Sequence, residues 1–250
     1  MISKNQMKLI RSLELKKNRK RENLFVAEGP KVVGDLLRGG YLPHSIFSTG
    51  QQIEAGGRRY EVQNVTEDEL RRISFLQHPQ EVLAVLEMPG QGRDVARRYD
   101  SELVLALDGV QDPGNMGTII RIADWFGIDT IFCSPDTADA WAPKVVQATM
   151  GSIARVHIIY GELAPLLDEA AKADIPVYGT LLDGQNIYEE QLTPGGIIIM
   201  GNEGNGISAP IRERITRRLL IPDFHQGPTA DSLNVAIATA ITCSEFRRRL

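Results

Sequence analysis

A continuous apolar segment, ELVLALDGV at residues 102–110, limits the fold more than any other feature of this sequence. An uninterrupted run of this kind is typical of a strand that is buried on both faces. Further short apolar runs follow it, separated by segments with helical periodicity. They are TIFCS (130–134), RVHIIY (155–160), IPVYGTLL (175–182), GGIIIMG (195–201) and RLLIP (218–222). The alternation predicts an α/β fold with a mostly parallel sheet and helices on both faces.

The same pattern predicts where the helices and domains lie. A smaller α/β unit precedes the long apolar run, and its Thr66–Glu69 pair has the spacing of a helix capping box. In the second domain, helices are expected near 114–126, 142–150, 162–173, 207–217 and 231–249. The chain then divides into a basic arm at 1–21, a small α/β domain at 22–90, a linker at 91–100 and the parallel-sheet domain at 101–250. The linker is predicted because its sequence, GRDVARRYD after PGQ, combines glycine with dense charge.

The charge is concentrated at one end of the chain. Residues 1–21 carry eight lysines and arginines against the single acid Glu14, so this segment is +7 and the rest of the chain is −11. A basic arm on an acidic body can follow a phosphate backbone. Charge alone is explained as well by a solvated helix face, and a mitochondrial transit peptide is a further alternative.

Composition excludes several classes of protein. The chain is 42% hydrophobic and 24% charged, which is ordinary for a globular protein. Its first twenty residues lack an apolar core, so a secretory signal is not expected, and the sequence has no window of about 18 apolar residues for a membrane helix. The two cysteines, Cys133 and Cys243, are too few for a disulfide framework or a zinc cage. We therefore expect a cytoplasmic protein with no membrane segment and no metal.

Polar residues directly follow three of the predicted strands, where ligands bind in open parallel sheets. The first of these segments covers residues 107–127. In it, Asp112 can cap a helix and Pro113 suits the first turn of that helix. Asn115 falls in that turn, and Arg121 faces away from the apolar stripe, free to hold a phosphate or carboxylate. A capped helix with a surface arginine explains each residue alone as well as a function does.

The second place is rich in glycine. Gly201, Gly204 and Gly206 surround Asn202 and Glu203 in the spacing G-x-x-G-x-G. Dinucleotide-binding loops have the spacing G-x-G-x-x-G, so a nicotinamide enzyme is disfavoured. The glycines suggest a backbone that comes close to a flat ligand, with an ordinary glycine turn as the alternative.

The third place opens the last predicted helix. Asp231 or Ser232 is expected to cap that helix, and Asn234 could hold a ligand oxygen in its first turn. Leu233 is expected to begin the buried face of the helix. That face is predicted to comprise Leu233, Ala236, Ile237, Ala240 and Ile241.

Together, and in this order, the three segments resemble the motifs of the SpoU (TrmH-type) branch of the SPOUT RNA methyltransferases. D-P-x-N-x-G-x-x-x-R corresponds to residues 112–121, G-N-E-G-x-G to 201–206, and I-P followed by S-L-N-V to 221–222 and 232–235. The resemblance covers residues 103–245, and F-V-x-E-G at 25–29 is similar to the substrate-binding domain that often precedes it. Asp223 replaces the usual methionine after I-P, and the spacing to S-L-N is a few residues longer, which indicates a reshaped loop.

The resemblance implies an enzyme that transfers a methyl group from S-adenosylmethionine to a ribose 2′-hydroxyl of rRNA or tRNA. It also implies a C-terminal trefoil knot, a homodimer and an N-terminal domain that grips RNA. By the same resemblance, the donor would lie near Thr180, Leu181, Gly201, Asn202, Ile221 and Leu233. The polar centre would comprise Asn115, Arg121, Glu203, Ser232 and Asn234. Family proposals make the arginine a base, but a guanidinium holds its proton, and phosphate anchoring is physically easier for Arg121.

Two other functions stay open from the residues alone. A non-catalytic RNA-binding protein with the same fold would fit Asp223 and the longer loop as signs of a lost donor site. A nucleotide-dependent oxidoreductase would bind a nicotinamide cofactor, although the glycine spacing disfavours it. Binding of S-adenosylmethionine distinguishes these alternatives.

Overall fold

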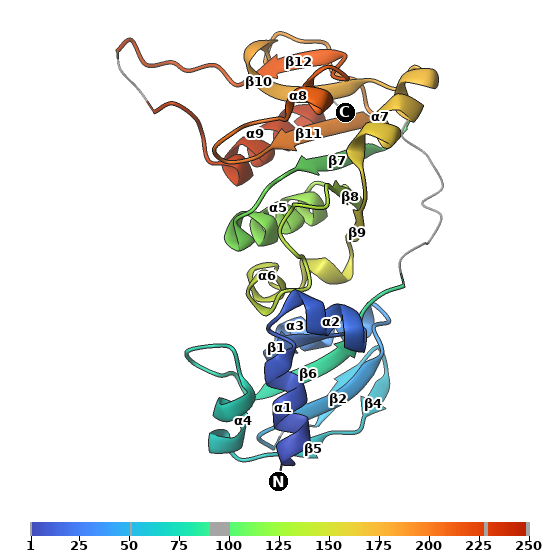
Figure 1. Cartoon of the computed structure of the whole chain (residues 1–250), viewed down its shortest axis with the longest axis vertical. Helices are drawn as coiled ribbons and strands as arrows, with labels where there is room; N and C mark the ends of the chain where they lie inside the picture. Colours follow the sequence, from blue (N-terminus) through green and yellow to red (C-terminus); the bar gives the residue numbers. More distant parts are fainter. Residues whose placement is uncertain (1, 51, 91–100, 228–229, 249–250) are drawn as a thin grey trace. The chain divides into compact units, whose positions relative to one another are not determined.

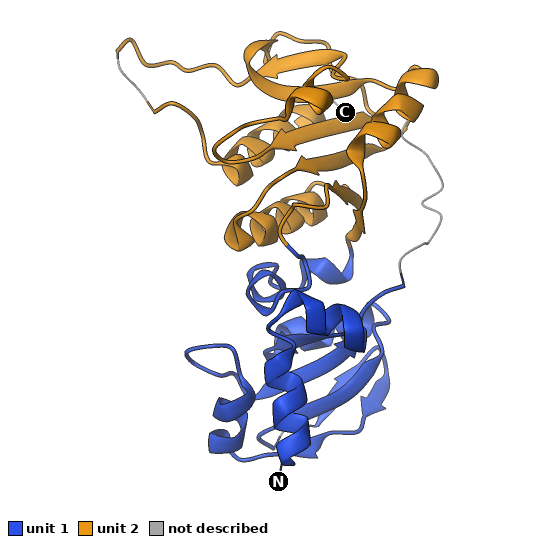
Figure 2. Ribbon diagram, viewed as in Figure 1, with its two compact units in different colours: residues 1–91, 139–155 blue, residues 92–138, 156–250 orange. Residues whose placement is uncertain are grey.

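The computed structural model describes residues 2–50, 52–90, 101–227 and 230–248. The predicted linker at 91–100 lies outside the described residues. The chain forms two compact units (Figure 2). Unit 1 comprises residues 1–91 and 139–155, and unit 2 comprises 92–138 and 156–250. Because residues 139–155 belong to unit 1, the sequence that follows residue 101 contributes to both units.

Unit 1 is built on a four-stranded sheet in the order β1-β6-β2-β5, in which β6 runs antiparallel to β1 and β2. A separate hairpin is formed by β3 and β4. The capping box predicted at Thr66 and Glu69 is present at the start of α4. The elements, labelled in Figure 1, are α1 (Lys4–Ser12), α2 (Lys16–Glu22), β1 (Leu24–Glu28), α3 (Pro30–Arg38), β2 (Pro43–Ser48), β3 (Ile53–Ala55), β4 (Arg58–Tyr60), β5 (Gln63–Asn64), α4 (Glu67–Ile73), β6 (Val82–Glu87), α6 (Pro143–Ala148) and the 3-10 turn Ser152–Ala154.

The basic segment at 1–21 is largely helical and contributes to the core of unit 1. Ile10 and Leu13 are buried there, in a cluster that includes Phe47 and Leu83. Two of its arginines, Arg11 and Arg19, contact residues far away in the sequence. Arg11 donates to the carbonyl of Ser74 at 2.8 Å and lies over the ring of Phe75. These contacts arise because an apolar stripe runs through the basic sequence and must be buried.

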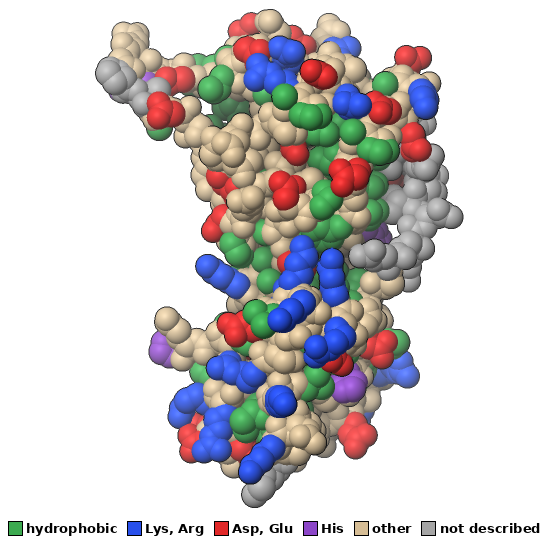
Figure 3. Space-filling model, viewed as in Figure 1, with side chains coloured by type: hydrophobic (Ala, Val, Ile, Leu, Met, Phe, Trp, Pro, Cys, Tyr) green, Lys and Arg blue, Asp and Glu red, His purple; other side chains and the backbone are tan. Residues whose placement is uncertain are grey.

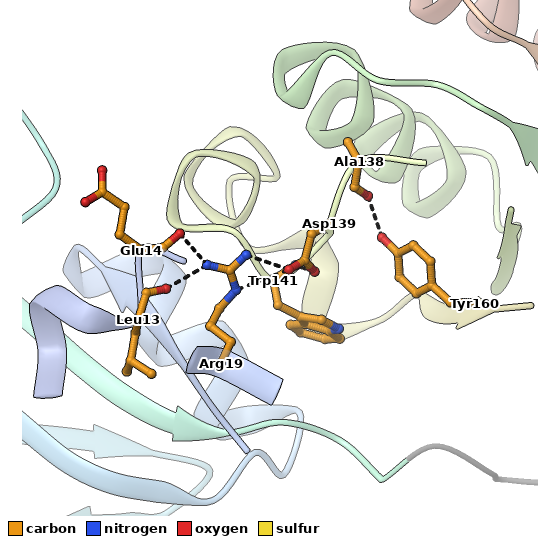
Figure 4. Close-up of polar contacts among 7 residues, drawn as sticks. All are labelled: Leu13, Glu14, Arg19, Ala138, Asp139, Trp141 and Tyr160. Atoms are coloured by element: carbon orange, nitrogen blue, oxygen red, sulfur yellow. Dashed lines mark hydrogen bonds and ion pairs between the residues drawn. The ribbon is translucent and has the colours of Figure 1, made fainter. Parts of the chain in front are cut away.

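Arg19 makes the second of these long-range contacts. The residue is only 2% exposed. Its guanidinium pairs with Asp139 at 2.5 Å and donates to the carbonyls of Leu13 and Glu14 (Figure 4). Trp141, two residues beyond Asp139, packs its ring against Phe25. A buried charge is tolerated only when it is paired and hydrogen-bonded, so Arg19 fixes residues 139–155 within unit 1.

Unit 2 contains a six-stranded, all-parallel sheet in the order β12-β10-β11-β7-β8-β9. All six strands that the sequence predicted are present, and β7 is buried at every residue as its apolar run requires. The elements are β7 (Leu103–Asp108), α5 (Pro113–Trp125), β8 (Thr130–Cys133), β9 (His157–Tyr160), α7 (Leu163–Lys172), β10 (Val177–Asn186), β11 (Gly196–Gly201), α8 (Ala209–Arg212), β12 (Arg217–Leu220) and α9 (Val235–Arg248) (Figure 1). None of the described helices is long and apolar enough to cross a membrane.

Two predicted helices differ from the structure. The helix expected at 207–217 is the single turn α8, because the chain must return to the sheet and enter β12 at Arg217. The helix expected at 231–249 begins only at Val235. Neither Asp231 nor Ser232 caps it. Instead, the side-chain oxygen of Asn234 accepts from the N–H groups of Ala236 and Ile237.

The buried face of α9 is also rotated from the predicted one. Leu233 and Ile237 are 51% and 53% exposed. Burial of threonine is possible because Thr239 and Thr242 donate their hydroxyls to the carbonyls four residues earlier, at 2.7 and 2.9 Å. An apolar stripe read from residue type alone misses such satisfied polar positions. The buried face is Val235, Ala236, Thr239, Thr242, Cys243, Glu245 and Phe246.

Candidate functional site

The three motif segments meet at the carboxyl edge of the unit 2 sheet. Parallel strands end at the same edge, and β7 pairs with β11 up to the register Asp108–Gly201. The segment after β7 and the glycine loop after β11 therefore begin side by side. Gly109 links them, because its carbonyl accepts from Asn202 Nδ2 at 2.7 Å. Gly109 has φ +72°, which favours glycine directly after the strand.

The glycine loop is closed on itself. Asn202 and Gly206 exchange two backbone hydrogen bonds of 2.9 Å, and Asn202 Oδ1 accepts from the N–H groups of Gly204 and Asn205. Gly201 must be glycine, because a Cβ there would lie 2.4 Å from backbone atoms of Gly206 and Ile207. At Gly206 a Cβ would meet nothing within 4 Å, although the φ of +67° favours glycine there as well. The loop is thus tightly packed at its base and bare on its outer side, which fits a flat ligand held by main-chain groups.

A line of hydrogen bonds joins one side chain from each motif. Asn234 Nδ2 donates to Asn115 Oδ1 at 2.9 Å, and Asn115 Nδ2 donates to Glu203 Oε1 at 2.9 Å. Glu203 also accepts from the backbone N–H groups of Gln111 and Asp112, each at 3.1 Å. Every donor in the line points toward the carboxylate, so the two amides are oriented by the negative charge at its end.

The pKa of Glu203 follows from these contacts. Partial burial acts to raise it, but the hydrogen bonds from Asn115, Gln111 and Asp112 outweigh burial, and the pKa is lowered from its usual value. A carboxyl whose pKa is lowered by folding stabilises the fold above the ordinary glutamate range, and this contribution is lost as the pH falls through the folded pKa. At neutral pH the Glu203 carboxylate is ionised and occupied by donors, so it is a poor proton acceptor.

Asp112 shapes the start of α5. Its carboxylate accepts from the N–H of Asn115 at 2.8 Å, which is the cap that the sequence predicted. Capping fixes the first helical turn and therefore the side chain of Asn115 that joins the line.

The other predicted polar residues stand apart from this line. Arg121 and Ser232 are both exposed, and within the described ranges the side chain of neither forms a hydrogen bond or an ion pair. The outward direction predicted for Arg121 is confirmed. The structure therefore brings together Asn115, Glu203 and Asn234 of the five predicted polar residues.

The residues predicted to hold a donor lie at the ends of neighbouring strands. Thr180 is half-buried in β10, with its hydroxyl 3.8 Å from the sulfur of Met200 in β11. Leu181 packs against a buried apolar cluster that includes Ile199 and Ile207. Ile221, directly after β12, is half-buried. Leu233 is exposed, so the packing role expected for it is wrong.

Sequence reasoning missed two residues that shape this edge. The Asp108 carboxylate at the end of β7 accepts from the N–H of Ser208 at 2.7 Å, beyond the glycine loop. Asp183 in β10 pairs with two arginines. Neither belongs to a recognisable motif, and only the pairing of strands distant in sequence reveals them. Among the described residues, no group of three or more histidine, cysteine, aspartate or glutamate side chains could hold a metal.

An all-parallel sheet with a glycine loop and convergent polar groups at its carboxyl edge is the arrangement in which open α/β domains bind ligands. The profile of the SpoU rRNA methylase family matches residues 102–244, and that of the MRM3-like substrate-binding domain matches residues 4–84. The chain therefore belongs to the SpoU rRNA methylase family.

Similar proteins agree with this assignment. RlmP of Bacillus subtilis, a 23S rRNA (guanosine(2553)-2′-O)-methyltransferase, is 33% identical over 98% of this chain and 97% of its own length. The crystal structure of an rRNA methyltransferase from Sinorhizobium meliloti with bound AdoMet (S-adenosylmethionine) has a TM-score of 0.86 and 32% identity, and the match covers 100% of this chain and 97% of that one. A TrmH-family protein from Porphyromonas gingivalis has a TM-score of 0.90 and 44% identity, with full coverage of both chains.

Proposed function

We propose that this protein transfers a methyl group from S-adenosylmethionine to a ribose 2′-hydroxyl of 23S ribosomal RNA. The observation that carries the proposal is the hydrogen-bonded line Asn234–Asn115–Glu203, which unites all three motifs at the carboxyl edge of the sheet. The full-length similarity to RlmP supports 23S rRNA as the substrate rather than tRNA. An oxidoreductase is disfavoured by the glycine spacing and by the family.

The bare outer side of the glycine loop supports donor binding there. S-adenosylmethionine supplies an electrophilic methyl group on a sulfonium. The main chain at Gly201 and Asn202, with Thr180, Leu181 and Ile221, would hold it between backbone groups and apolar walls. Leu233, which is exposed, is free to contact it.

The protein's own residues then align the acceptor. Arg121 carries an exposed guanidinium that can bind a phosphate of the RNA bidentately and bring the hydroxyl into line with the methyl group. Asn115 and Asn234 are held in fixed orientations by the hydrogen bonds that join them to Glu203, and Ser232 offers an exposed hydroxyl in the third motif. Glu203 acts by orienting these amides, because its lowered pKa and its bound donors make it a poor base.

Two experiments test the proposal. Calorimetry is expected to detect binding of S-adenosylmethionine and S-adenosylhomocysteine, and binding of neither would favour the non-catalytic alternative. Mapping of 2′-O-methyl marks in RNA from cells with and without the gene is expected to show the loss of one mark in 23S rRNA. A mark lost from tRNA instead would contradict the assigned substrate.

We also propose a cytoplasmic homodimer, knotted as the family resemblance implies. Trp125 at the end of α5 is 84% exposed and Ile237 in the adjacent helix α9 is 53% exposed. Large apolar side chains on neighbouring helices are typical of a surface that a second copy covers. Light scattering is expected to give the mass of two chains, and the mass of one chain would contradict the dimer.

Unit 1 is proposed to bind RNA through phosphate contacts. Lys and Arg side chains gather over the helices of unit 1 in Figure 3. Lys17 and Lys20 of α2 are exposed and, within the part of the chain that is described, have no ion-pair partner. Arg11 and Arg19 are occupied by structural contacts, so they are not counted among the phosphate ligands.

Replacing Lys17 and Lys20 together by glutamine should weaken RNA binding and flatten its salt dependence. Each lost phosphate contact reduces the magnitude of the negative slope of log affinity against log salt by about 0.7 to 0.9. Deletion of residues 1–21 is a poor test, because Ile10 and Leu13 belong to the core. Lys172→Gln, an exposed lysine of α7, is the control. If the salt dependence of RNA affinity were unchanged in the double variant, α2 would be a solvated helix face and not part of the RNA-binding surface.

A further inference from the structure

Strand β10 carries an irregular segment next to the proposed donor site. Thr180 and Gln185 both pair with Leu219 of β12, so residues 181–184 form a bulge that leaves and rejoins the sheet. The bulge returns in close contact, because a Cβ at Gly184 would lie 2.4 Å from the carbonyl carbon of Leu219. A bulge of this kind re-aims the side chains that it carries. Here it begins at Leu181, one of the residues expected to hold the donor.

One carboxylate ties this bulge to both neighbouring motif segments. Asp183 Oδ2 accepts from Arg212 of α8 at 2.7 Å and from Arg218 of β12 at 2.8 Å. Helix α8 directly follows the glycine loop, and β12 leads directly to Ile221. Through these two ion pairs, Asp183 connects β10 to the helix that follows the second motif and to the strand that precedes the third.

The ionised form of Asp183 is favoured at neutral pH. Desolvation acts to raise its pKa, but the hydrogen bond from Arg212 and the charges of Arg212 and Arg218 outweigh it, and the pKa is lowered. The carboxylate form that makes both ion pairs is therefore the form present at neutral pH.

We propose that Asp183 is a positioning residue for donor binding, holding the 181–184 bulge against Arg212 and Arg218 so that Thr180 and Leu181 face the glycine loop. This inference rests on the proposed function, since it takes the donor to lie at these residues. Asp183 does not itself need to touch the donor or the RNA.

The fold does not depend on these pairs. Asp183, Arg212 and Arg218 are each nearly half exposed, and ion pairs at such positions contribute little to global stability. The effect is instead local, because the bulge lacks the regular ladder of hydrogen bonds that would otherwise fix it. A variant without the charge should fold normally and lose donor affinity.

Asp183→Asn is expected to weaken binding of S-adenosylmethionine by about fivefold in calorimetry, the scale of an ion-pair network at a half-exposed site. The KM for the donor should rise by the same factor, while kcat at saturating donor stays unchanged. Asp183→Glu, which keeps the charge, should recover part of the affinity.

Asp168→Asn is the matched control, because Asp168 forms a similar exposed pair with Arg214 at 2.8 Å but lies on α7, away from the bulge. Its donor affinity should equal that of the unaltered protein. Equal affinities for Asp183→Asn and the control would overturn the inference. Failure of the unaltered protein to bind the donor would instead overturn the proposed function.

Gly184→Ala supplies an independent second variant. Its methyl group would collide with the backbone of Leu219 and displace the bulge without changing any charge. Donor binding is expected to fall at least as far as in Asp183→Asn. A Gly184→Ala protein that folds and binds the donor normally would show that the position of the bulge does not matter.

Discussion

Arg121→Ala is expected to lower kcat for methyl transfer by a hundredfold or more while the Kd for S-adenosylmethionine stays unchanged. The exposed guanidinium of Arg121 has no partner within the described ranges, so it is available to the RNA. Loss of one charged anchor that aligns the reacting atoms costs about a hundredfold in rate. Single-turnover methylation and donor calorimetry measure the two quantities separately.

Arg121→Lys is the informative companion variant. Lysine keeps the positive charge but loses the planar pair of donors, so partial activity is expected if a bidentate phosphate contact is what matters. A parallel fall of donor affinity and turnover in Arg121→Ala would place Arg121 on the donor side of the site and contradict the RNA-side role.

Gly201→Ala is expected to destabilise unit 2 by about 2–3 kcal/mol, the usual scale for forcing extra atoms into a packed position. The added methyl group would lie 2.4 Å from the carbonyl carbon of Gly206 and the nitrogen of Ile207, and backbone atoms cannot swing aside as a side chain can. Opening the base of the glycine loop should also abolish donor binding. Denaturant unfolding and calorimetry measure the two effects.

Gly204→Ala is the matched control in the same loop. A Cβ at this position would come no closer than 3.6 Å to Asn202 Oδ1, which is an ordinary contact. Its backbone N–H would still donate to Asn202. Near-normal stability is expected, and equal damage from both alanines would show that the loop tolerates no side chain anywhere, rather than being tightly packed only at Gly201.

Much of the fold could be predicted because its signals are local. The apolar run that became β7 is buried throughout, and the caps at Asp112 and Thr66 are where their spacing places them. In the site, the order of the motifs predicted that their polar residues converge, and the line from Glu203 through Asn115 to Asn234 bears this out geometrically. The functional roles of these residues stay predictions.

The rest depended on contacts between residues far apart in the sequence. The buried face of α9 was misread because Thr239 and Thr242 satisfy their hydroxyls within the helix, which residue type alone does not reveal. The basic segment was predicted to be an arm that follows RNA or a solvated helix face, yet the Arg19 side chain pairs with Asp139, 120 residues later. Likewise, the proposed positioning role of Asp183 could not be predicted, because it depends on ion pairs with Arg212 and Arg218 on two other elements.

The membership of residues 139–155 in unit 1 has a consequence for how such a gene can be recombined. The polypeptide passes between the units at three points, near residues 91, 138 and 155. If only the first ninety codons were moved into the gene of a relative, Arg19 and Phe25 would be separated from Asp139 and Trp141, the residues that they contact. We therefore expect a functional chimera to need residues 139–155 from the same parent as residues 1–90, because both segments build unit 1.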